Sequence, residues 1–280
     1  MFECRVAHED DWPILKAFYS RAYRESHPLQ NRRYWLWRFG DPNLGKAYIC
    51  LDHDKVAGHV GASFADGFSW MLSAYNLPEY RGRGVMAMLY DFAGKQHPHL
   101  VTTNANLPCI NFYRKIGWIR YSDLERYTLI NPKVKSKEQL CSPMELKEPW
   151  DMVPEGHYWL QPGLKSVILP DGTTAVDQLQ AGGLRLVEIA DPQRVGELAW
   201  QAGAMWVDYI TSWTDPLCRT LPTLGWQFGD DSEVPWNLNP VEWGSKAKVS
   251  YLAQHPMPHD FIVRRYHCDH GRVGSLPAED

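Results

Sequence analysis

The chain has 280 residues, with 29 Lys and Arg against 33 Asp and Glu, so its formal charge is −4. At about 150 residues per domain, this length predicts two domains, or one domain with a large extension. Hydrophobic residues make up 44% and charged residues 22%, which is typical of packed globular proteins and excludes a disordered chain. A mildly acidic chain has no general attraction for nucleic acid or anionic lipid, so neither is expected as a partner.

Neither a membrane span nor a secretory leader is predicted. No apolar run reaches the roughly 18 residues that a membrane-spanning helix needs. The opening residues, MFECRVAHEDDW, carry acids where a secretory signal would have a basic start and an apolar run. We therefore expect a cytoplasmic protein.

The cysteines are scattered and predict neither a zinc ribbon nor a disulfide scaffold, because none stands in a C-x-x-C pair. Most should be buried thiols. Near the C-terminus, the run His267-Cys268-Asp269-His270 has the composition of a metal site. Neighbours on a strand alternate faces, so four adjacent residues cannot converge on one ion, and no metal is expected. The six cysteines are Cys4, Cys50, Cys109, Cys141, Cys218 and Cys268.

The first half of the chain alternates strand and helix signals. Acids at 9–11 suit a helix N-terminus, because the helix dipole favours negative charge there. Ile14, Phe18 and Ala22 then recur at a spacing of four on one helix face. In chain order we expect a strand at 3–7, helices at 9–24 and 31–39, a hairpin at 47–64, a strand at 69–77, a helix at 85–93, a strand at 100–106, a helix at 107–117 and a last strand or strand pair at 118–130.

Beyond residue 130 the periodicity breaks and then returns. Five prolines interrupt 131–163, which indicates a linker or crossing segment. Strand and helix signals alternate again afterwards, which predicts an α/β arrangement with mixed sheets. The predicted domains are 1–130, the linker 131–163, and 164–280. In the last of these we expect strands at 166–170 and 184–190, a helix after 191–192, a strand at 205–212, a helix at 217–225, and late strands at 246–253 and 261–266.

The sharpest local pattern is the segment PEYRGRGVM, from Pro78 to Met86. A strand ends there, a turn of glycine and arginine follows, and a helix begins at once. Glycines let main-chain N–H groups converge without a Cβ in the way, and a new helix offers unpaired N–H groups to an anion. Arg81 and Arg83 add positive charge suited to phosphate. The segment predicts a diphosphate cradle, although Arg-Gly turns also occur as plain solvated loops.

A second pattern follows about twenty residues later, in NLPCINFYRKIGW from Asn106 to Trp118. The run RGRGVM resembles the R-x-x-G-x-G/A pyrophosphate motif of GNAT-type N-acyltransferases, which use acyl-CoA. FYRKIGW resembles the LYEKLGF signature of the same family, with Asn106 seven residues before Tyr113 as that family has it. Met86 stands where the family usually has Gly or Ala. The resemblance covers about residues 1 to 130.

The resemblance implies a fold and a cofactor site. The fold would be α/β, a GNAT fold with a central mixed, mostly antiparallel, splayed sheet flanked by helices. The strand before the loop would part from its neighbour and pair its main chain with the pantetheine arm of acetyl-CoA or another short acyl-CoA. Asn106 would contact the pantetheine or line the cleft. The other residues implied for CoA binding are Tyr75, Asn76 and Leu77 on the strand, and Arg81, Gly82, Arg83, Gly84, Val85 and Met86 on the loop.

The resemblance also places Tyr113 near the thioester sulfur as general acid. A phenol with a pKa of about 10 is protonated at neutral pH, so it can donate a proton as the C–S bond breaks. Without the resemblance, Tyr113 is an aromatic core residue beside Phe112. The attacking amine must be neutral, so a base or water relay is expected. His59 is the candidate base, with Glu79 and Asp66 as alternatives, and a lone His on an apolar strand is more often a core residue.

A finer resemblance concerns the acceptor. The segments YWLWRFGDPNLG, VAGHVGAS and VTTNANLP are similar to a branch of the family associated with surface-polysaccharide biosynthesis. Its members acylate the amine of a nucleotide-linked amino sugar. Trp35, Trp37 and Trp70 would then stack on a sugar or base. The alternative is that these tryptophans pack a helix against the sheet.

A faint internal repeat relates the second half to the first. A shift of 108 residues superposes SWTDPLCRTLPTLGW on NANLPCINFYRKIGW, with Gly225-Trp226 on Gly117-Trp118. Leu221 stands where the implied acid stands, and the helix of this half opens at an Asp-Pro pair instead of an arginine-glycine loop. We expect a degenerate GNAT-like half-domain that has no CoA site of its own and completes the acceptor cleft. Chance similarity between short alternating modules is the alternative.

These patterns favour an N-acyltransferase that moves an acetyl or short acyl group from acyl-CoA to a primary amine. A peptide, polyamine or antibiotic amine is the alternative to an amino sugar. A second hypothesis is a non-catalytic acyl-CoA-binding protein that retains the fold. A third takes the Arg-Gly turn as a nucleic-acid contact, and the acidic net charge argues against it. The sequence leaves open the acceptor, the acyl length, the general base, and whether the protein is a monomer or homodimer.

Overall fold

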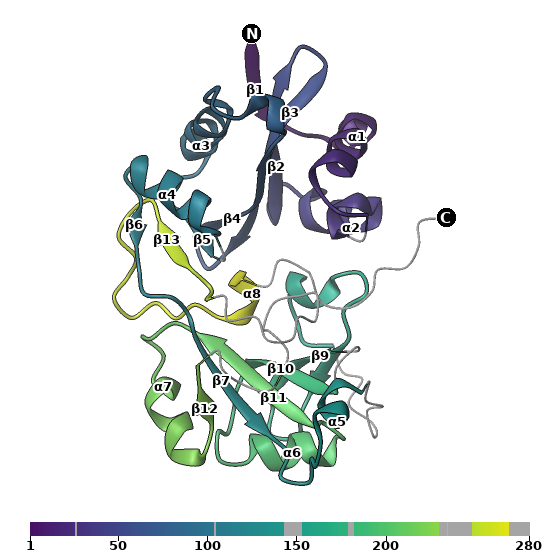
Figure 1. Ribbon diagram of the computed structural model, residues 1–280, viewed down its shortest axis with the longest axis vertical. Helices are drawn as coiled ribbons and strands as arrows, with labels where there is room; N and C mark the ends of the chain where they lie inside the picture. The colour runs from purple at the N-terminus through teal and green to yellow at the C-terminus, as the bar shows by residue number, and fades with distance from the viewer. Residues whose placement is uncertain are drawn as a thin grey trace. The chain divides into compact units, whose positions relative to one another are not determined.

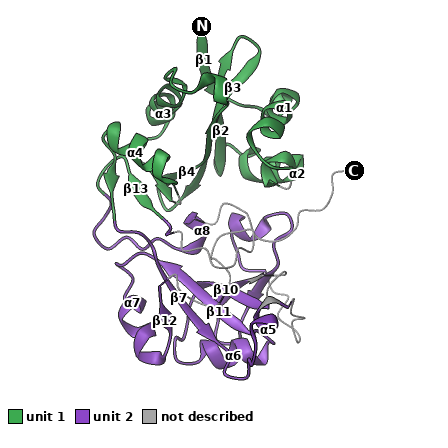
Figure 2. Cartoon of the chain, viewed as in Figure 1, with its two compact units in different colours: residues 1–121, 250–256, 276–280 green, residues 122–249, 257–275 purple. Residues whose placement is uncertain are grey.

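The computed structural model describes residues 1–25, 27–103, 105–142, 153–178, 182–229, 234 and 248–268. The chain divides into two compact units (Figure 2). The described residues of 1–121 and 250–256 form the first unit, and those of 122–249 and 257–268 form the second.

The first unit is one sheet with helices on both faces (Figure 1). Its strands are β1 (Phe2–Val6), β2 (Gly45–Asp52), β3 (Lys55–Ala65), β4 (Phe68–Asn76), β5 (Leu100–Thr103), β6 (Ile119–Arg120) and β13 (Tyr251–Ala253). Its helices are α1 (Trp12–Ala22), α2 (Arg32–Phe39), α3 (Val85–Gln96) and α4 (Leu107–Lys115), with 3₁₀ helices at Glu9–Asp11, Pro28–Gln30 and Pro78–Tyr80. The sheet order is β1-β2-β3-β4-β5-β13-β6.

The two helical layers explain the burial pattern of the central strands. α1 and α2 lie on one side of the sheet and α3 on the other (Figure 1). Residues 56–62 of β3 are therefore all buried, without the alternation of a sheet that is half exposed. On α1, Leu15, Phe18 and Tyr19 are buried at spacings of three and four, so this helix turns one face to the sheet.

The sheet parts between β4 and β5. These parallel strands pair only from Ser69 and Leu100 to Met71 and Thr102, while β4 continues beside β3 to Asn76. A register shift in the β3–β4 ladder and a left-handed Ser73 (φ 51°) bend β4 just after the last pair. We call the point where β4 and β5 separate the fork.

The second unit contains another mixed sheet. Its strands are β7 (Glu125–Ile130), β8 (Ser166–Ile168), β9 (Thr174–Gln178), β10 (Gly183–Glu188), β11 (Trp206–Thr211) and β12 (Gln227–Phe228). Its helices are α5 (Lys137–Cys141), α6 (Val195–Gln201), α7 (Leu217–Thr220) and α8 (Arg265–Cys268), with 3₁₀ helices at His157–Leu160 and Leu221–Leu224. The order is β12-β7-β11-β10-β9-β8, with β10 and β11 parallel.

The two sheets exchange a strand. In the first unit β13, from late in the chain, lies between β5 and β6 and is antiparallel to both. In the second unit β7 lies between β11 and β12 and is again antiparallel to both. The strand 125–130, expected to close the first domain, therefore belongs to the second unit, and the chain returns at 250–256 to complete the first.

The internal repeat has a structural counterpart. In the first unit the N–H of Trp118 donates to Tyr113 O (3.0 Å) after the left-handed Gly117 (φ 89°). In the second unit the N–H of Trp226 donates to Leu221 O (3.2 Å) after the left-handed Gly225 (φ 85°). The same helix-ending turn thus follows β5 and β11, which both pair with a parallel neighbour.

Several local expectations differ from the structure. Residues 261–266, predicted as a strand, run through an irregular segment into the short helix α8, and Asp269 and His270 lie outside the described residues. Within the described ranges, we find no cluster of His, Cys, Asp or Glu able to hold a metal. None of the helices described is long and apolar enough to cross a bilayer. Cys4, Cys50, Cys109, Cys218 and Cys268 are free thiols, whereas the side chain of Cys141 is not described.

Candidate functional site

The arginine-glycine turn lies between the end of β4 and the start of α3, as the sequence predicts. Gly82 (φ 75°) and Gly84 (φ 80°) both have left-handed backbones, which side chains rarely adopt. A Cβ at either position would meet nothing within 4 Å, so the space above the turn is open. The first N–H groups of α3, from Val85 and Met86, face this turn without partners inside the helix.

Aromatic rings hold the two arginines of this turn. Arg81 donates from Nη2 to the hydroxyl of Tyr75 (3.2 Å), and its guanidinium lies 5.6 Å from the centre of that ring. The guanidinium of Arg83 lies 4.7 Å from the ring centre of Phe2 and 5.4 Å from that of Tyr80. Both arginines are exposed, so the turn combines oriented positive charge, open space and a helix N-terminus. These features fit a diphosphate.

The end of β4 presents main-chain groups to the fork. The N–H of Leu77 donates to Ala57 O (3.1 Å) on the β3 side. Because successive residues of a strand alternate the direction of their N–H and C=O groups, those of Asn76 point away from β3. Tyr75 and Asn76 are half-buried and the side chain of Leu77 is buried. A chain-like ligand could therefore pair with β4 at Asn76.

Tyr113 lies at the fork but is buried. It is 3% exposed, its ring stacks on Trp118 (4.7 Å between centroids), and its hydroxyl hydrogen-bonds the hydroxyl of Tyr90 on α3. Burial raises the pKa of Tyr113 above its ordinary value, and hydrogen bonds to Tyr90 and Thr102 oppose this shift. Thr102 is the last β5 residue paired with β4, which puts the phenol where the strands separate. The phenol is protonated at neutral pH and can act only as a proton donor.

His59 is placed as a core residue. It is 0% exposed and lies among the rings of Phe18, Tyr19 and Phe39, at 5.2 to 6.2 Å between centroids. Its Nδ1–H donates to Ser73 O (3.1 Å), the carbonyl that also accepts the hydroxyl of Tyr23 (2.8 Å). Burial lowers the pKa of His59 to about 4, so the ring is neutral and enclosed at neutral pH. His59 supports the bend in β4 and is not placed to receive a proton from an amine.

The alternative bases differ in position. Glu79 is exposed beside the turn and accepts from Arg21 (2.7 Å). Hydrogen bonds from its own main chain and from Arg21 lower the pKa of Glu79, which makes it a weaker base.

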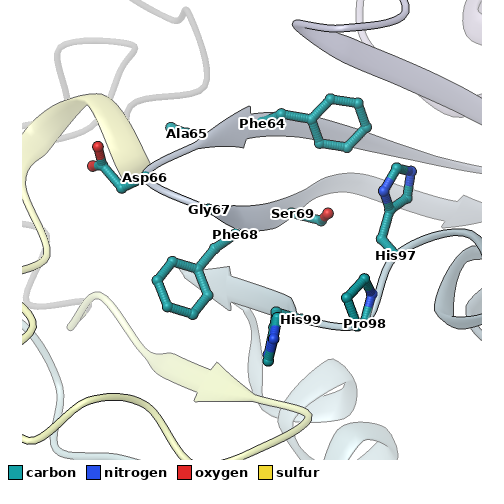
Figure 3. A pocket seen from close by; sticks show the side chains of 9 residues that line it. All are labelled: Phe64, Ala65, Asp66, Gly67, Phe68, Ser69, His97, Pro98 and His99. Carbon is teal, nitrogen blue, oxygen red and sulfur yellow. The ribbon is translucent and has the colours of Figure 1, made fainter.

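Asp66 lies in the β3–β4 turn, nine residues from Tyr75, or roughly 25 to 30 Å along β4. That end of the hairpin borders a separate cavity of about 340 Å³ (Figure 3). Asp66 is therefore excluded from the fork. The cavity is lined by Phe64, Ala65, Asp66, Gly67, Phe68, Ser69, His97, Pro98 and His99.

Two of the three tryptophans predicted to stack on a sugar are core residues. Trp35 and Trp70 are each 1% exposed, and their Nε1–H groups donate to Tyr19 Oη and Ala65 O (3.2 Å each). Neither ring has a face open to a ligand. Trp37 is half-buried, with the guanidinium of Arg38 4.3 Å from its ring centre. Burial therefore argues against the predicted stacking by Trp35 and Trp70, and stacking by Trp37 stays a prediction.

Asn106 caps α4. Its Oδ1 accepts the N–H of Cys109 (3.1 Å), which satisfies a free donor of the first helical turn. The sequence did not indicate Tyr90, Thr102 or Phe2 as site residues. Only the meeting of α3, α4 and β5 brings Tyr90 and Thr102 to the proposed acid, and no local pattern signals that contact.

Residues 12–118 match the model of the acetyltransferase (GNAT) family. Among curated proteins, none matches this chain.

Three solved structures share the fold across both units. A GCN5-related N-acetyltransferase from Kribbella flavida has a TM-score of 0.55 at 14% identity, over 90% of this chain and 70% of that one. A protein from Pyrococcus horikoshii assigned to the acetyltransferases has a TM-score of 0.53 at 13% identity, over 99% of this chain and 94% of that one. A conserved protein from Enterococcus faecalis V583 has a TM-score of 0.53 at 13% identity, over 90% of this chain and 72% of that one. At these identities the likeness concerns the fold, and it confirms the predicted GNAT fold with a second, GNAT-like half.

Proposed function

We propose that the chain, whose first unit has the GNAT fold and matches the acetyltransferase family model over residues 12–118, is an N-acyltransferase. It would move an acetyl or short acyl group from acyl-CoA to a primary amine by direct attack, without a covalent enzyme intermediate. One observation carries the proposal: the open arginine-glycine turn stands at the end of β4, and Tyr113 stands at the fork that β4 forms with β5. An anion site and a proton donor thus lie on the same parted strand pair.

Binding of the acyl donor is assigned to three groups of atoms. The N–H groups of 82–86 and the guanidiniums of Arg81 and Arg83 would hold the diphosphate. The main chain of Asn76 would pair with the pantetheine arm, in the manner of an added strand. This would aim the thioester into the fork, toward Tyr113.

The proton chemistry is assigned to a tyrosine pair. As the neutral amine nitrogen bonds to the thioester carbon, the C–S bond breaks and the departing sulfur takes the proton of Tyr113. The proton that the new amide nitrogen releases would pass to water, and a proton from water would restore the phenol afterwards. The phenolate left behind would accept a hydrogen bond from Tyr90, which offsets part of the cost of a buried anion. Since Tyr113 is 3% exposed, the sulfur would have to reach its hydroxyl from within the fork, and the O–H of Tyr113 would point to the sulfur while Tyr90 donates to the phenol oxygen. His59 takes no part in proton transfer in this proposal.

An amino sugar, carried on a nucleotide, is our proposed acceptor. Support comes from the segments that resemble the surface-polysaccharide branch and from Trp37, the half-buried member of the predicted tryptophans. Peptide, polyamine and antibiotic amines are the competing acceptors. A panel of acyl-CoAs tested with amino-sugar nucleotides and with these other amines decides between the acceptors. Transfer to peptide, polyamine or antibiotic amines alone would refute the proposal of an amino-sugar acceptor.

Titration calorimetry with acetyl-CoA, paired with a turnover assay, tests the enzyme. Wild type should bind, and Arg81→Glu should abolish binding because it puts a carboxylate beside the diphosphate. Tyr113→Phe should bind as wild type does and lose turnover. Wild-type turnover in Tyr113→Phe would refute the assigned acid. Binding without transfer to any amine of the panel would favour the non-catalytic acyl-CoA-binding alternative.

A further inference from the structure

The sheet of the second unit has a fork of its own. β10 and β11 are parallel and pair from Gly183 and Trp206 to Leu186 and Tyr209. A register shift in β10 follows directly after Leu186. The parallel pair β4–β5 of the first unit stops pairing in the same way just before its bend. The second fork is the place that corresponds to the acyl-CoA position in the first unit.

A segment of the same chain is bound to the β11 side of this fork. The N–H of Ser212, just after β11, donates to Val263 O (3.2 Å), and the N–H of Val263 donates back to Ser212 Oγ (2.9 Å). The hydroxyl of Thr214 donates to Phe261 O (2.7 Å). The main chain at 261–263 therefore pairs with the end of β11.

The same segment reaches the β10 side. Nε of Arg265 donates to Leu186 O (3.2 Å), the carbonyl at which β10–β11 pairing stops. Nη2 of Arg265 donates to Asp208 Oδ1 (2.7 Å) on β11. Val263 and Arg265 are both 0% exposed. The segment thus bridges both arms of the fork and is buried there.

The start of α6 also differs from the turn before α3. Asp191 accepts the N–H of Gln193 with Oδ1 (2.9 Å), and its carbonyl accepts those of Arg194 (3.2 Å) and Val195 (3.0 Å). These N–H groups are the ones that an anion would need, and the carboxylate of Asp191 stands among them. A diphosphate would meet the carboxylate of Asp191 here, and this turn has the one arginine Arg194 where the turn before α3 has Arg81 and Arg83.

We propose that residues 261–268 are a built-in ligand of the second unit, seated where acyl-CoA lies in the first. The chain then binds one acyl-CoA, in the first unit. The second fork instead holds residues 261–268 between β10 and β11. The inference rests on the proposed function for its comparison of the two forks. The second fork then has no room for CoA because residues 261–268 already occupy it.

Titration of the full chain with CoA measures the number of sites. We expect one CoA per chain in wild type and none in Arg81→Glu. The control Arg219→Glu makes the same charge change at an exposed position on α7 and should keep one site. Two sites in wild type, or one remaining in Arg81→Glu, would overturn the inference.

Hydrogen exchange tests the seated segment separately from the proposed function. The amide of Val263 should exchange slowly in the ligand-free protein, because its partner Ser212 Oγ is part of the buried fork. Saturating CoA should slow exchange at 75–88 and leave 261–268 unchanged. Fast exchange at Val263, or a change at 261–268 on adding CoA, would overturn the inference. If wild type binds no CoA, the proposed function fails, and slow exchange at Val263 still supports the seated segment.

Discussion

Replacing His59 by glutamine isolates one buried imidazole as a source of acid sensitivity. The pKa of His59 falls from 6.5 to about 4 because burial disfavours the charged ring. Below about pH 6.5 the unfolded chain takes up a proton at this residue, while the folded protein does not until about pH 4. The stability that depends on neutral His59 is thus complete above about pH 6.5 and is lost progressively as the pH falls toward 4.

The size of this loss follows from the two pKa values. Each pH unit inside the window changes the free energy of unfolding by about 1.4 kcal/mol, so moving from about pH 7.5 to about pH 5 removes about 2 kcal/mol through His59. Glutamine does not titrate, and its longer side chain carries an amide N–H that can donate to a carbonyl in place of the imidazole. The variant should therefore keep the support of the β4 bend and lose the pH dependence.

Urea unfolding followed by circular dichroism at these two pH values measures the effect. The difference between wild type and His59→Gln cancels the contributions of the other histidines. Wild type should lose about 2 kcal/mol more than the variant. His259→Gln, at an exposed position, is the matched control and should lose as much as wild type. Equal losses in wild type and His59→Gln would refute the reasoning, because they would mean that the imidazole is not held neutral by burial.

Four further substitutions test other parts of the structure. Gly84→Ala forces a side chain into a left-handed backbone and should cost about 1 to 2 kcal/mol by urea unfolding, and calorimetry should show weaker acetyl-CoA binding. Asp208→Asn removes the carboxylate that three buried guanidiniums share and should cost about 3 to 5 kcal/mol. Tyr90→Phe should lower kcat about tenfold and leave acetyl-CoA affinity unchanged, because the lost hydrogen bond matters only to the phenolate. Trp35→Ala should cost about 3 to 5 kcal/mol, clearly more than the same change at half-buried Trp37.

The sequence predicts local geometry correctly where all the residues that determine it lie in one short segment. The left-handed Gly82 and Gly84, the flanking arginines and the following helix lie within a few residues of each other, so their geometry needs no distant partner. The same holds for the helix ending at Gly117, where one turn closes on itself. The assignment of Tyr113 as acid and of an amino-sugar acceptor came from family resemblance, and both stay predictions.

The same sequence patterns do not predict which of the candidate site side chains are buried. His59, Trp35 and Trp70 have the composition of site residues, but all three are buried, His59 among aromatic rings of α1 and α2. Whether an aromatic or imidazole ring faces ligand or core depends on which elements cover it. That is a property of contacts between segments far apart in the chain.

The amino-acid sequence alone determined the α/β class, most element positions in the first half, the open turn at the end of β4 and the faint repeat at 108 residues, because each depends on periodicity or turn chemistry within one segment. The tertiary structure decided the exchange of β7 and β13, the pairing of Tyr90 with Tyr113, and the seating of 261–268 in the second fork. A strand carries no local signal for the sheet it will join, since main-chain hydrogen bonds are the same in either sheet. Which sheet β7 or β13 joins is therefore decided by the strand edges that the rest of the fold leaves unpaired.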